Sequence, residues 1–400
     1  MKTLSSTLLF AALALSACQQ QASDDALKAK AKELAQKFII VDTHVDVPYR
    51  LREKMEDISV RTAGGDFDYV RAKEGGLNAP FMSIYVPSDY EKNGAKALAD
   101  TLIDMVEKFT TDWPDKFALA KSPADVRAQF AQGLISLPMG MENGAPIEGK
   151  LGSLRYFYDR GIRYITLTHG RDNHICDSSY DTTRTWRGLS PFGKEVVAEM
   201  NRLGLMIDVS HISDEAFHQV MEHTKAPVIA SHSSCRFFTP GWERNMDDEM
   251  IKRLAQNHGV LQINFGSSFI SDSYRKTEEK MWQYYEEHKL NPGSEEGKAF
   301  AKKFKEANKL DYAGISEVAA HFDHVVKLVG VDHVGFGSDF DGVGDSLPKG
   351  LKSVADFPNL IAELLKRGYS EENIEKICSG NVLRVWSKVE EVAQQMQASN

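Results

Sequence analysis

Short runs of apolar, often β-branched residues alternate along this chain with stretches in which apolar residues recur every three or four positions. The short runs are typical of strands, and the longer periodic stretches are typical of helices. Several runs are apolar at consecutive positions, as in parallel strands that helices cover on both faces. The eight runs that predict strands are 38–42, 80–86, 134–139, 163–168, 205–209, 228–231, 260–265 and 334–337.

Two of the intervening helices carry clear end signals. Ser190 is an N-cap followed by a proline in the first turn, and Gly204 ends the same helix. Ser316 opens another helix, which Gly330 ends. Eight strands with helices between them predict an α/β fold, a (β/α)8 TIM-type barrel, with an open doubly wound sheet as the alternative.

One long segment, 268–311, interrupts the alternation after the seventh strand. It is rich in Glu and Lys with aromatic residues interleaved, which predicts one or two surface helices. Two interpretations remain open for this helical insertion. It is either a solvated insertion without a part in catalysis, or a lid or wall of a substrate cleft.

The first residues have the pattern of a bacterial lipoprotein signal. After Lys2, an apolar run too short to span a bilayer leads to Leu15-Ser16-Ala17-Cys18. This sequence resembles the lipobox, whose cysteine is acylated and becomes the mature N-terminus. A plain secretory signal with a chance cysteine is the alternative. Gln19 after the cysteine implies sorting to the outer membrane, facing the periplasm.

The chain therefore divides into four predicted parts, all in the cell envelope. These are a signal peptide at 1–17, a polar tether at 18–36, a barrel domain at 37–390 and a C-terminal tail at 391–400.

Composition narrows the range of partners. The 400 residues carry a formal net charge of −9 that is spread along the chain, without a basic stripe, so nucleic acid is not expected to bind. The other cysteines, Cys176, Cys235 and Cys378, are odd in number and form no Cys-x-x-Cys pair. They indicate neither a disulfide framework nor a thiolate metal site.

Six of the predicted strands are followed by an imidazole or a carboxylate. These residues are His44 and Asp46, Glu142, His169, His211, His232 and Asp339. Because the carboxyl ends of barrel strands meet at one mouth, they predict a metal site rather than isolated structural groups. Three histidines and two carboxylates without thiolates favour zinc, with manganese or cobalt as substitutes. Five ligands exceed what one catalytic zinc takes, which favours two ions that share a carboxylate.

At these motifs the sequence is similar to the membrane (renal) dipeptidases. The similarity runs from about Ile39 to Trp386, with the motifs in family order. They are HVD at 44–46, MENG at 141–144, YITLTH at 164–169, GLSPFG at 188–193, IDVSH at 207–211, SHSS at 231–234, RN at 244–245, GSDFDG at 337–342 and GNVLRVW at 380–386.

The resemblance implies hydrolysis of small dipeptides, including those with a C-terminal D-residue, by a hydroxide that bridges two Zn²⁺ ions. It assigns His44 and Asp46 to one zinc, His211 and His232 to the other, and Glu142 to both. The resemblance leaves the oligomeric state open, with a homodimer as one expectation.

The remaining implied roles concern the substrate. His169 would contact it and help to stabilise the tetrahedral oxyanion, Arg244 would pair with its terminal carboxylate, and Asp339 would be the acid/base. The sequence departs from the family in two places. Asn143 stands where the family usually has glycine, which bears on the cleft wall. Gly170 and Arg171 stand where mammalian members have a cysteine, so their disulfide is not expected.

Elementary electrostatics favours the same substrate class. Two Zn²⁺ ions carry +4, and Asp46, Glu142 and a hydroxide offset −3, so the residual charge of about +1 and Arg244 favour a free carboxylate. Asp339 is preferred as the acid/base to Asp341, which is expected to stabilise the turn before Gly342.

The other polar candidates are expected to have supporting roles. Asp42 shares a strand face with His44 and is the candidate partner for it, and Asp208 is expected to order a strand end. The remaining histidines, at 174, 218, 223, 258, 288, 321, 324 and 333, are expected to be structural.

Two rival functions predict a different set of residues. Other metal-dependent barrel hydrolases, such as deaminases or lactonases, often begin with His-x-His and use a carbamylated lysine after the fourth strand. This chain has His44-x-Asp46, and His169 follows that strand. A periplasmic binding lipoprotein without catalysis would be expected to lack ligands, and all five are present. Side-chain preference, the resting metal and the oligomeric state stay open.

Overall fold

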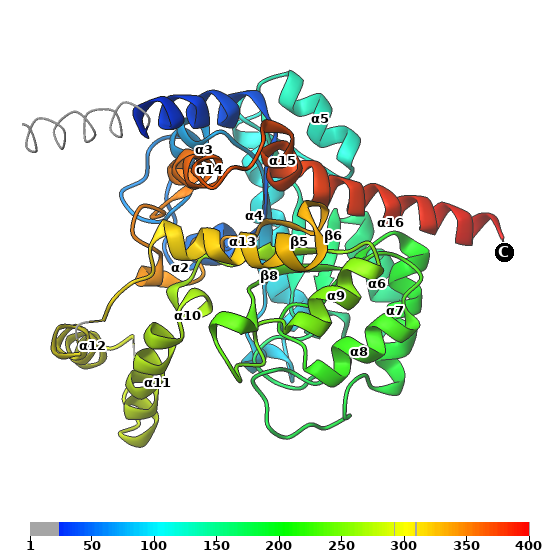
Figure 1. Cartoon of the computed structure of the whole chain (residues 1–400). Helices are drawn as coiled ribbons and strands as arrows, with labels where there is room; N and C mark the ends of the chain where they lie inside the picture. Colours follow the sequence, from blue (N-terminus) through cyan, green and yellow to red (C-terminus); the bar gives the residue numbers. More distant parts are fainter. Residues whose placement is uncertain (1–23, 292, 309, 400) are drawn as a thin grey trace, which may run out of the picture.

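The structure is a computed structural model that describes residues 24–399 apart from 292 and 309. Its centre is a closed barrel of parallel strands in the order β1-β10-β9-β8-β7-β6-β5-β2 (Figure 1). The barrel strands are β1 Ile40–Val45, β2 Leu77–Tyr85, β5 Met139–Glu142, β6 Ile162–Thr166, β7 Met206–Asp208, β8 Ile229–Ser233, β9 Val260–Ile263 and β10 Val334–Phe336. The predicted TIM-type barrel is confirmed.

One of the eight predicted strands, 134–139, is wrong as a barrel strand. Its central residues form β4 (Ile135–Leu137), which pairs with β3 (Phe117–Leu119) in a separate sheet of two strands. Pro138 lies between β4 and the true barrel strand β5, and proline has no N–H with which to continue a ladder. Glu142 is consequently the last residue of a strand and not a loop residue.

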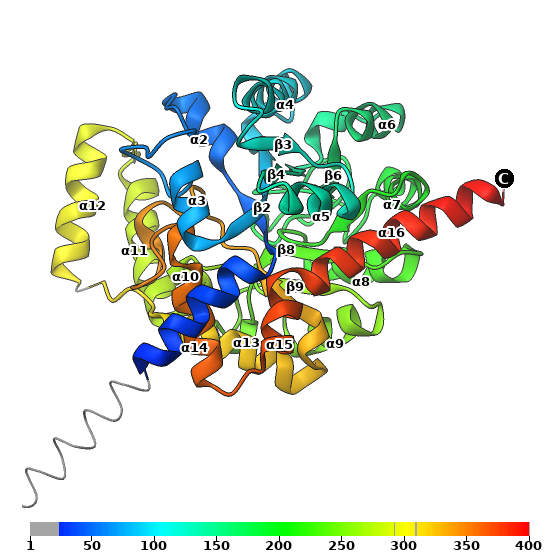
Figure 2. The same ribbon diagram turned by 90° about the horizontal axis from the view of Figure 1, so that it is seen from above.

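Helices surround the barrel on its outer face, as Figure 2 shows from the end at which the strands begin. Ser190 and Gly204 cap α7 as predicted, through a hydrogen bond from Gly193 N–H and a left-handed C-cap. The helices are α2 Val47–Glu53, α3 Tyr69–Gly75, α4 Ala95–Asp112, α5 Pro123–Ala131, α6 Gly152–Asp159, α7 Pro191–Leu203, α8 Asp214–His223, α9 Asp248–Gln256, α10 Ser267–Ile270, α11 Asp272–Glu287, α12 Glu295–Ala307, α13 Ile315–Val329, α14 Phe357–Lys366, α15 Glu371–Glu375 and α16 Asn381–Ala398.

The apolar core has two parts. One lies between the barrel and its helices, and the other fills the barrel interior, where inward residues such as Phe81 and Tyr164 pack with α16. Trp386 of α16 lies 5.3 Å from the Phe81 ring, which lies 5.5 Å from the Tyr164 ring. The interior core therefore closes the amino end of the barrel, and the carboxyl end is left for polar residues.

The chain ends differ from the prediction. Residues 24–37 are helical, with Ala31 and Leu34 fully buried, so the tether predicted for 18–36 is helix from residue 24 onward. The tail predicted for 391–400 continues α16 to Ala398, where Ala393 packs against the body of the protein. The predicted signal peptide at 1–17 and Cys18 lie outside the described residues. No helix in the described part has the length and apolar character needed to cross a bilayer.

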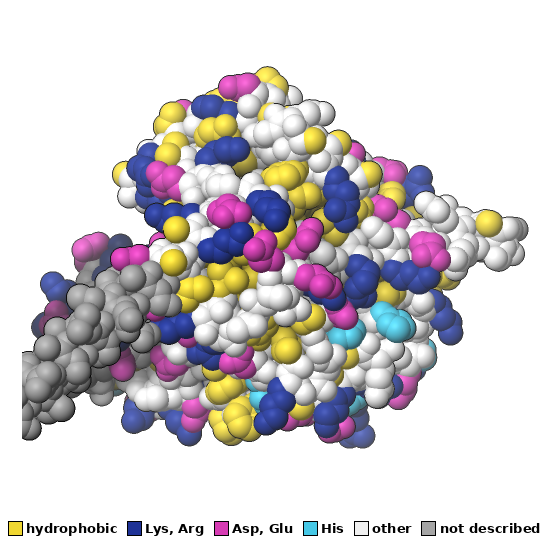
Figure 3. Space-filling model, turned by 45° about the horizontal axis from the view of Figure 1, so that its top comes forward, with side chains coloured by type: hydrophobic (Ala, Val, Ile, Leu, Met, Phe, Trp, Pro, Cys, Tyr) yellow, Lys and Arg dark blue, Asp and Glu magenta, His cyan; other side chains and the backbone are white. Residues whose placement is uncertain are grey.

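The predicted helical insertion after the seventh strand is confirmed as α10, α11 and α12. Helices α11 and α12 project from one side of the barrel in both views (Figures 1 and 2). Elsewhere, on the face shown in Figure 3, basic and acidic side chains alternate, with small apolar areas between them. Cys176, Cys235 and Cys378 are buried and unpaired in the described structure.

Candidate metal centre and active site

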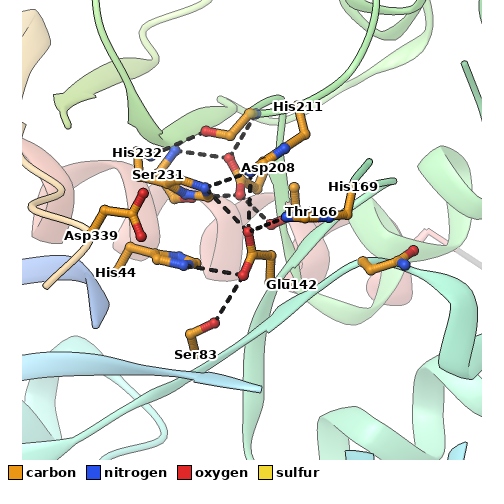
Figure 4. A network of polar contacts seen from close by, with 12 residues as sticks. His44, Ser83, Glu142, Thr166, His169, Asp208, His211, Ser231, His232 and Asp339 are labelled. Atoms are coloured by element: carbon orange, nitrogen blue, oxygen red, sulfur yellow. Dashed lines mark hydrogen bonds and ion pairs between the residues drawn. The ribbon is translucent and has the colours of Figure 1, made fainter. Parts of the chain in front are cut away.

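Glu142 lies in the middle of four imidazoles at the carboxyl end of the barrel (Figure 4). Its Oε1 atom lies 3.1 Å from Nε2 of His211, 3.3 Å from Nε2 of His232 and 3.5 Å from Nε2 of His169. Its Oε2 atom lies 3.3 Å from Nε2 of His44, which lies 3.3 Å from Asp46 Oδ2. The structure therefore brings together all five predicted metal ligands, and one carboxylate faces two separate groups of donors.

Two of the imidazoles are aimed by strand irregularities. Between Asp42 and Val45, β1 has one residue more than its partner β2, and between Ala230 and Ser233, β8 has one more than β9. Such β-bulges turn a side chain away from the regular alternation and are frequent beside active sites. His44 and His232 lie in these two bulges.

The tautomer of His44 is fixed by a chain of hydrogen bonds. The Tyr164 hydroxyl donates to the carbonyl oxygen of Thr43 (2.9 Å), so its oxygen is free to accept from Nδ1–H of His44 (2.9 Å). With the proton on Nδ1, the lone pair of Nε2 points at Asp46 and Glu142. This is the form in which imidazole binds a metal.

The tautomer of His232 is fixed in the same way. The Ser231 hydroxyl donates to Asp208 (2.6 Å) and accepts from Nδ1–H of His232 (2.7 Å). Asp208 also accepts from the Thr166 hydroxyl and from the backbone N–H groups of Ser231 and Ser210. The expected role of Asp208 in ordering a strand end is thus confirmed, and the lone pair of His232 Nε2 is directed into the site.

The arrangement fits a divalent cation. The Nε2 atoms of His211 and His232 lie 2.8 Å apart, and Nε2 of His44 and Oδ1 of Asp46 are buried without a hydrogen-bond partner among the described residues. Burial lowers the pKa of both His211 and His232 well below the usual value, which keeps their nitrogens free to bind. Nitrogen and carboxylate donors without thiolates suit zinc.

The pKa values of His44 and Glu142 also indicate that the site favours a positive charge. Burial lowers the pKa of His44, but Tyr164, Glu142 and Asp46 together hold it well above the usual value. Burial likewise opposes ionisation of Glu142, yet the surrounding imidazoles hold its pKa well below its usual range. A bound cation would take the place of the proton that these carboxylates attract to His44.

His169 and Asp339 border the donors. His169 is the most exposed of the four imidazoles, at 23% of its side chain, and lies against the ring of Tyr85 (4.8 Å). Asp339 accepts a hydrogen bond from the Asn264 amide (2.7 Å), and burial, with Asp46 and Glu142 nearby, raises its pKa to about 7. Its backbone is in the left-handed region (φ 63°), as is that of His211 (φ 69°), which indicates strain at the site.

Arg244 is buried at 3% exposure beside the metal ligands. Its terminal nitrogens donate to the Ser233 hydroxyl (2.7 Å) and the carbonyl oxygen of His232 (2.9 Å), while its Nε has no partner. Its guanidinium packs over the Phe269 ring at 5.0 Å. Within the described structure it forms no ion pair with a carboxylate, so its buried positive charge is not neutralised there.

Two supporting residues differ from expectation. Asp42 does not reach the His44 ring, because the bulge intervenes; it accepts from the backbone N–H groups of His44 and Ser338. Asp341 does not hold its own turn but pairs with Arg50 (3.1 Å) and accepts from Asp66 N–H.

The backbone conformation of Asn143 explains why asparagine can stand where the family usually has glycine. Its φ of 80° lies in the left-handed region, which asparagine tolerates better than most residues. Its side chain donates to the Val86 carbonyl oxygen and accepts from Ala145 N–H and the Asn173 amide. The asparagine therefore ties the loop after β5 to the segments that follow β2 and β6.

A cleft of about 850 Å³ opens above the candidate metal centre. It is lined by Asp46, Glu142, His169, His211 and Asp339, by Tyr49, Tyr85 and Tyr180, and by residues of the insertion. The insertion is thus a wall of the cleft, which decides between the two interpretations left open by the sequence.

Several contributors were not recognised from the sequence. Ser83 and Tyr85 lie at the end of β2, and Asn264 follows β9 directly. These are the two strands for which no polar terminus was identified, and applying the strand-end rule to every strand would have found them. Tyr164 lies inside a strand, and nothing in the local pattern marks its hydroxyl as functional.

Comparisons with known protein families and sequences both give matches to dipeptidases. Residues 28–400 match the family model described as membrane dipeptidase (peptidase family M19). An uncharacterized dipeptidase of Schizosaccharomyces pombe is 35% identical over 387 residues, which is 91% of this chain and 84% of that protein.

Two solved structures are similar in fold. The probable dipeptidase PvdM from Pseudomonas aeruginosa has a TM-score of 0.80 and 27% identity over 92% of this chain and 100% of that chain. A metallopeptidase from Rhodobacter sphaeroides, liganded with a phosphinate mimic of the dipeptide L-Ala-D-Ala, has a TM-score of 0.73 and 25% identity over 88% and 99%.

Proposed function

Because the chain belongs to the membrane dipeptidase family, peptidase family M19, and is a dipeptidase of the metallopeptidase class, we propose that it hydrolyses dipeptides with two zinc ions. One observation carries the proposal. The two oxygens of Glu142 face different donors: Oε2 faces His44, and Oε1 faces His211 and His232. A carboxylate shared in this way is what a pair of ions requires.

Each ion would have its own set of ligands. His44, Asp46 and Glu142 would hold one, and His211, His232 and Glu142 the other. Three protein ligands per zinc leave a place for water or substrate, as in catalytic zinc sites. When bound, the two ions would polarise the scissile carbonyl and lower the pKa of water, which supplies a nucleophile near neutral pH.

Arg244 would bind the substrate's terminal carboxylate. A buried guanidinium without an anionic partner favours a ligand with a free carboxylate over a neutral one. The bonds from Arg244 to Ser233 and to the His232 carbonyl oxygen fix its position relative to a metal ligand. A fixed distance between carboxylate and scissile bond permits one residue on the leaving side, so dipeptides are preferred to tripeptides.

Asp339 and His169 would assist the chemistry. A carboxyl group with a pKa near 7 can both accept and return a proton at neutral pH, and the amine that leaves needs one. Asn264 holds one oxygen of Asp339 in place. His169, at the cleft wall near Glu142, would donate a hydrogen bond to the oxygen of the tetrahedral intermediate.

A substrate panel tests this function. Purified protein is assayed on L,L and L,D dipeptides, the matching tripeptides and C-terminally amidated dipeptides, with and without added zinc. We expect zinc-dependent cleavage of free dipeptides, including those with a C-terminal D-residue, as the ligand of the Rhodobacter relative suggests. Cleavage of tripeptides or amides at the rate of free dipeptides would refute carboxylate recognition.

We also propose that Cys18 carries a lipid that anchors the chain in the envelope, facing the periplasm. The Leu15-Ser16-Ala17-Cys18 motif supports this. Helix 24–37 leads into the start of β1, so the chain enters the barrel at the end opposite the cleft. Acyl chains contribute about 0.8 kcal/mol of membrane affinity per buried methylene. Cys18→Ser should release the protein from the membrane fraction, and a wild-type mature N-terminus without lipid in mass spectrometry would contradict the anchor.

A further inference from the structure

The cleft extends well beyond the metal centre. The far wall comes from the insertion, with Glu278, Met281, Trp282 and Tyr285 of α11 and Ala301 and Lys305 of α12. Pockets that enclose drug-sized ligands measure about 300–1,000 Å³. A cleft of about 850 Å³ therefore has room for a dipeptide with a long side chain.

The α11 residues of this wall form one face of the helix. Glu278, Met281, Trp282 and Tyr285 follow the spacing i, i+3, i+4, i+7, which places side chains in a single row. Met281 and Tyr285 are buried, and Trp282 is 49% exposed. The row therefore presents apolar and aromatic surface with one carboxylate at its end.

That carboxylate has no cation of its own. Lys305 is the basic residue nearby, and both oxygens of Asp345 hold its ammonium group, at 2.7 and 2.8 Å. Glu278 is hydrogen-bonded to Ser268 and forms no ion pair with any residue that the structure describes. Burial raises its pKa, with Lys305 opposing, so the group has lost part of its hydration.

A partly desolvated carboxylate beside aromatic rings is the arrangement that binds organic cations. Asp341 and Asp345 also line the cleft, but Arg50 and Lys305 already pair with them. Glu278 is therefore the carboxylate of this wall that is left for a cationic ligand. A neutral side chain of equal length would fill the same space but leave Glu278 unpaired. Glu278 therefore favours a substrate with a cationic side chain over one with an apolar side chain.

We propose that this face of α11 is the side-chain pocket of the enzyme, and that it selects dipeptides with a lysine or arginine residue. The proposal rests on the proposed dipeptidase function. It assigns the insertion a role in specificity, with Glu278 as the residue that contacts the cationic group and Trp282 and Tyr285 as the surface along which the methylene chain lies.

Matched dipeptides test the proposal. Lysine and norleucine have side chains of similar length and differ in charge, so kcat/KM is measured for Lys-Ala, norleucine-Ala, Ala-Lys, Ala-norleucine and Ala-Ala. We expect the wild type to prefer lysine to norleucine at one of the two positions by about tenfold or more, as for a partly desolvated charge pair. In Glu278→Gln the ratio should fall close to one, and in Glu278→Lys a glutamate dipeptide should replace the lysine one as the better substrate.

Glu286→Gln is the matched control, because Glu286 is an exposed carboxylate of the same helix that does not line the cleft. It should keep the wild-type ratio. Equal rates on lysine and norleucine dipeptides at both positions would overturn the proposal. So would a Glu278→Gln variant that loses both activities in parallel, since that marks a structural residue. If Ala-Ala and every other dipeptide resist cleavage, the proposed function itself fails, which separates the two outcomes.

Discussion

Replacing Tyr164 by phenylalanine tests whether its hydroxyl orients the imidazole of His44 toward the metal site. The hydroxyl accepts from His44 Nδ1–H and donates to the Thr43 carbonyl oxygen, both at 2.9 Å in a fully buried site. The substitution removes a single oxygen atom. The ring keeps its place beside Phe81 (5.5 Å), so the interior core is preserved. What changes is that nothing holds the proton on Nδ1 of His44.

The expected magnitude follows from these two bonds. A buried polar group left without a partner costs about 1–3 kcal/mol, and losing the support of a metal-binding histidine typically weakens affinity about 10–100-fold. We expect the ion proposed to bind at His44 and Asp46 to bind 10–100-fold more weakly, or about 1.4–2.7 kcal/mol. The ion proposed to bind at His211 and His232 should be affected less, because Ser231 orients His232 independently.

The assay is competition with a chromophoric zinc chelator, which resolves two dissociation constants per chain. Thermal unfolding with saturating zinc shows whether the fold is retained. Tyr158→Phe, at a half-buried tyrosine that stacks on Arg163 away from the cleft, is the control and should bind both ions like the wild type. Wild-type affinity for both ions in Tyr164→Phe would show that Tyr164 does not orient His44.

Three further outcomes are expected. Glu142→Ala removes a ligand from both halves of the site, so elemental analysis should find most of the metal lost, and retention of about two ions per chain would contradict a shared carboxylate. Arg244→Met should lower kcat/KM for free dipeptides by about 100-fold or more, the 2–5 kcal/mol range of a lost buried charge pair, with metal content unchanged. Burial lowers the pKa of His321 to about 3, and its ring bonds Cys235 N–H and the Ile270 carbonyl oxygen. The unfolded chain takes up this proton near pH 6.5, whereas the folded protein does not. The free energy of unfolding therefore decreases as the pH is lowered from about 6.5 to about 3, by up to about 1.4 kcal/mol per pH unit. Urea unfolding should show a shallower slope in His321→Gln, and an identical slope would refute this assignment.

The clustering of the candidate ligands was predictable because a barrel gathers its strand ends at one place. His211 and Glu142 are far apart in the sequence, yet each closes an apolar run, and that topological rule brings their side chains to 3.1 Å. The same rule failed to locate the third strand, since 134–139 is as apolar as a barrel strand. Only the three-dimensional pairing of β4 with β3 separates it from β5.

The residues that orient the candidate metal ligands were harder to predict than the candidate ligands themselves. The alternation of a strand places Asp42 and His44 on one face, but a bulge breaks that alternation, so the ring partner is Tyr164 from a different strand. Bulges arise from the register of two neighbouring strands, which a single sequence does not display. The helix at 24–37 was missed because four of its six apolar residues are alanines, so its buried positions, Ala31 and Leu34 among them, do not form a strong apolar pattern.

The projecting helices α11 and α12 have an evolutionary consequence. The two helices also contact each other: Tyr284 stacks on Phe300 at 3.9 Å, and the Tyr285 hydroxyl donates to the Gly297 carbonyl oxygen. In α12 only Gly297 is buried. Substitutions at the exposed positions of α12 can therefore accumulate without unfolding the barrel or moving the candidate metal ligands. The substrate preference of such a protein can therefore change during evolution while the residues of the metal site stay the same.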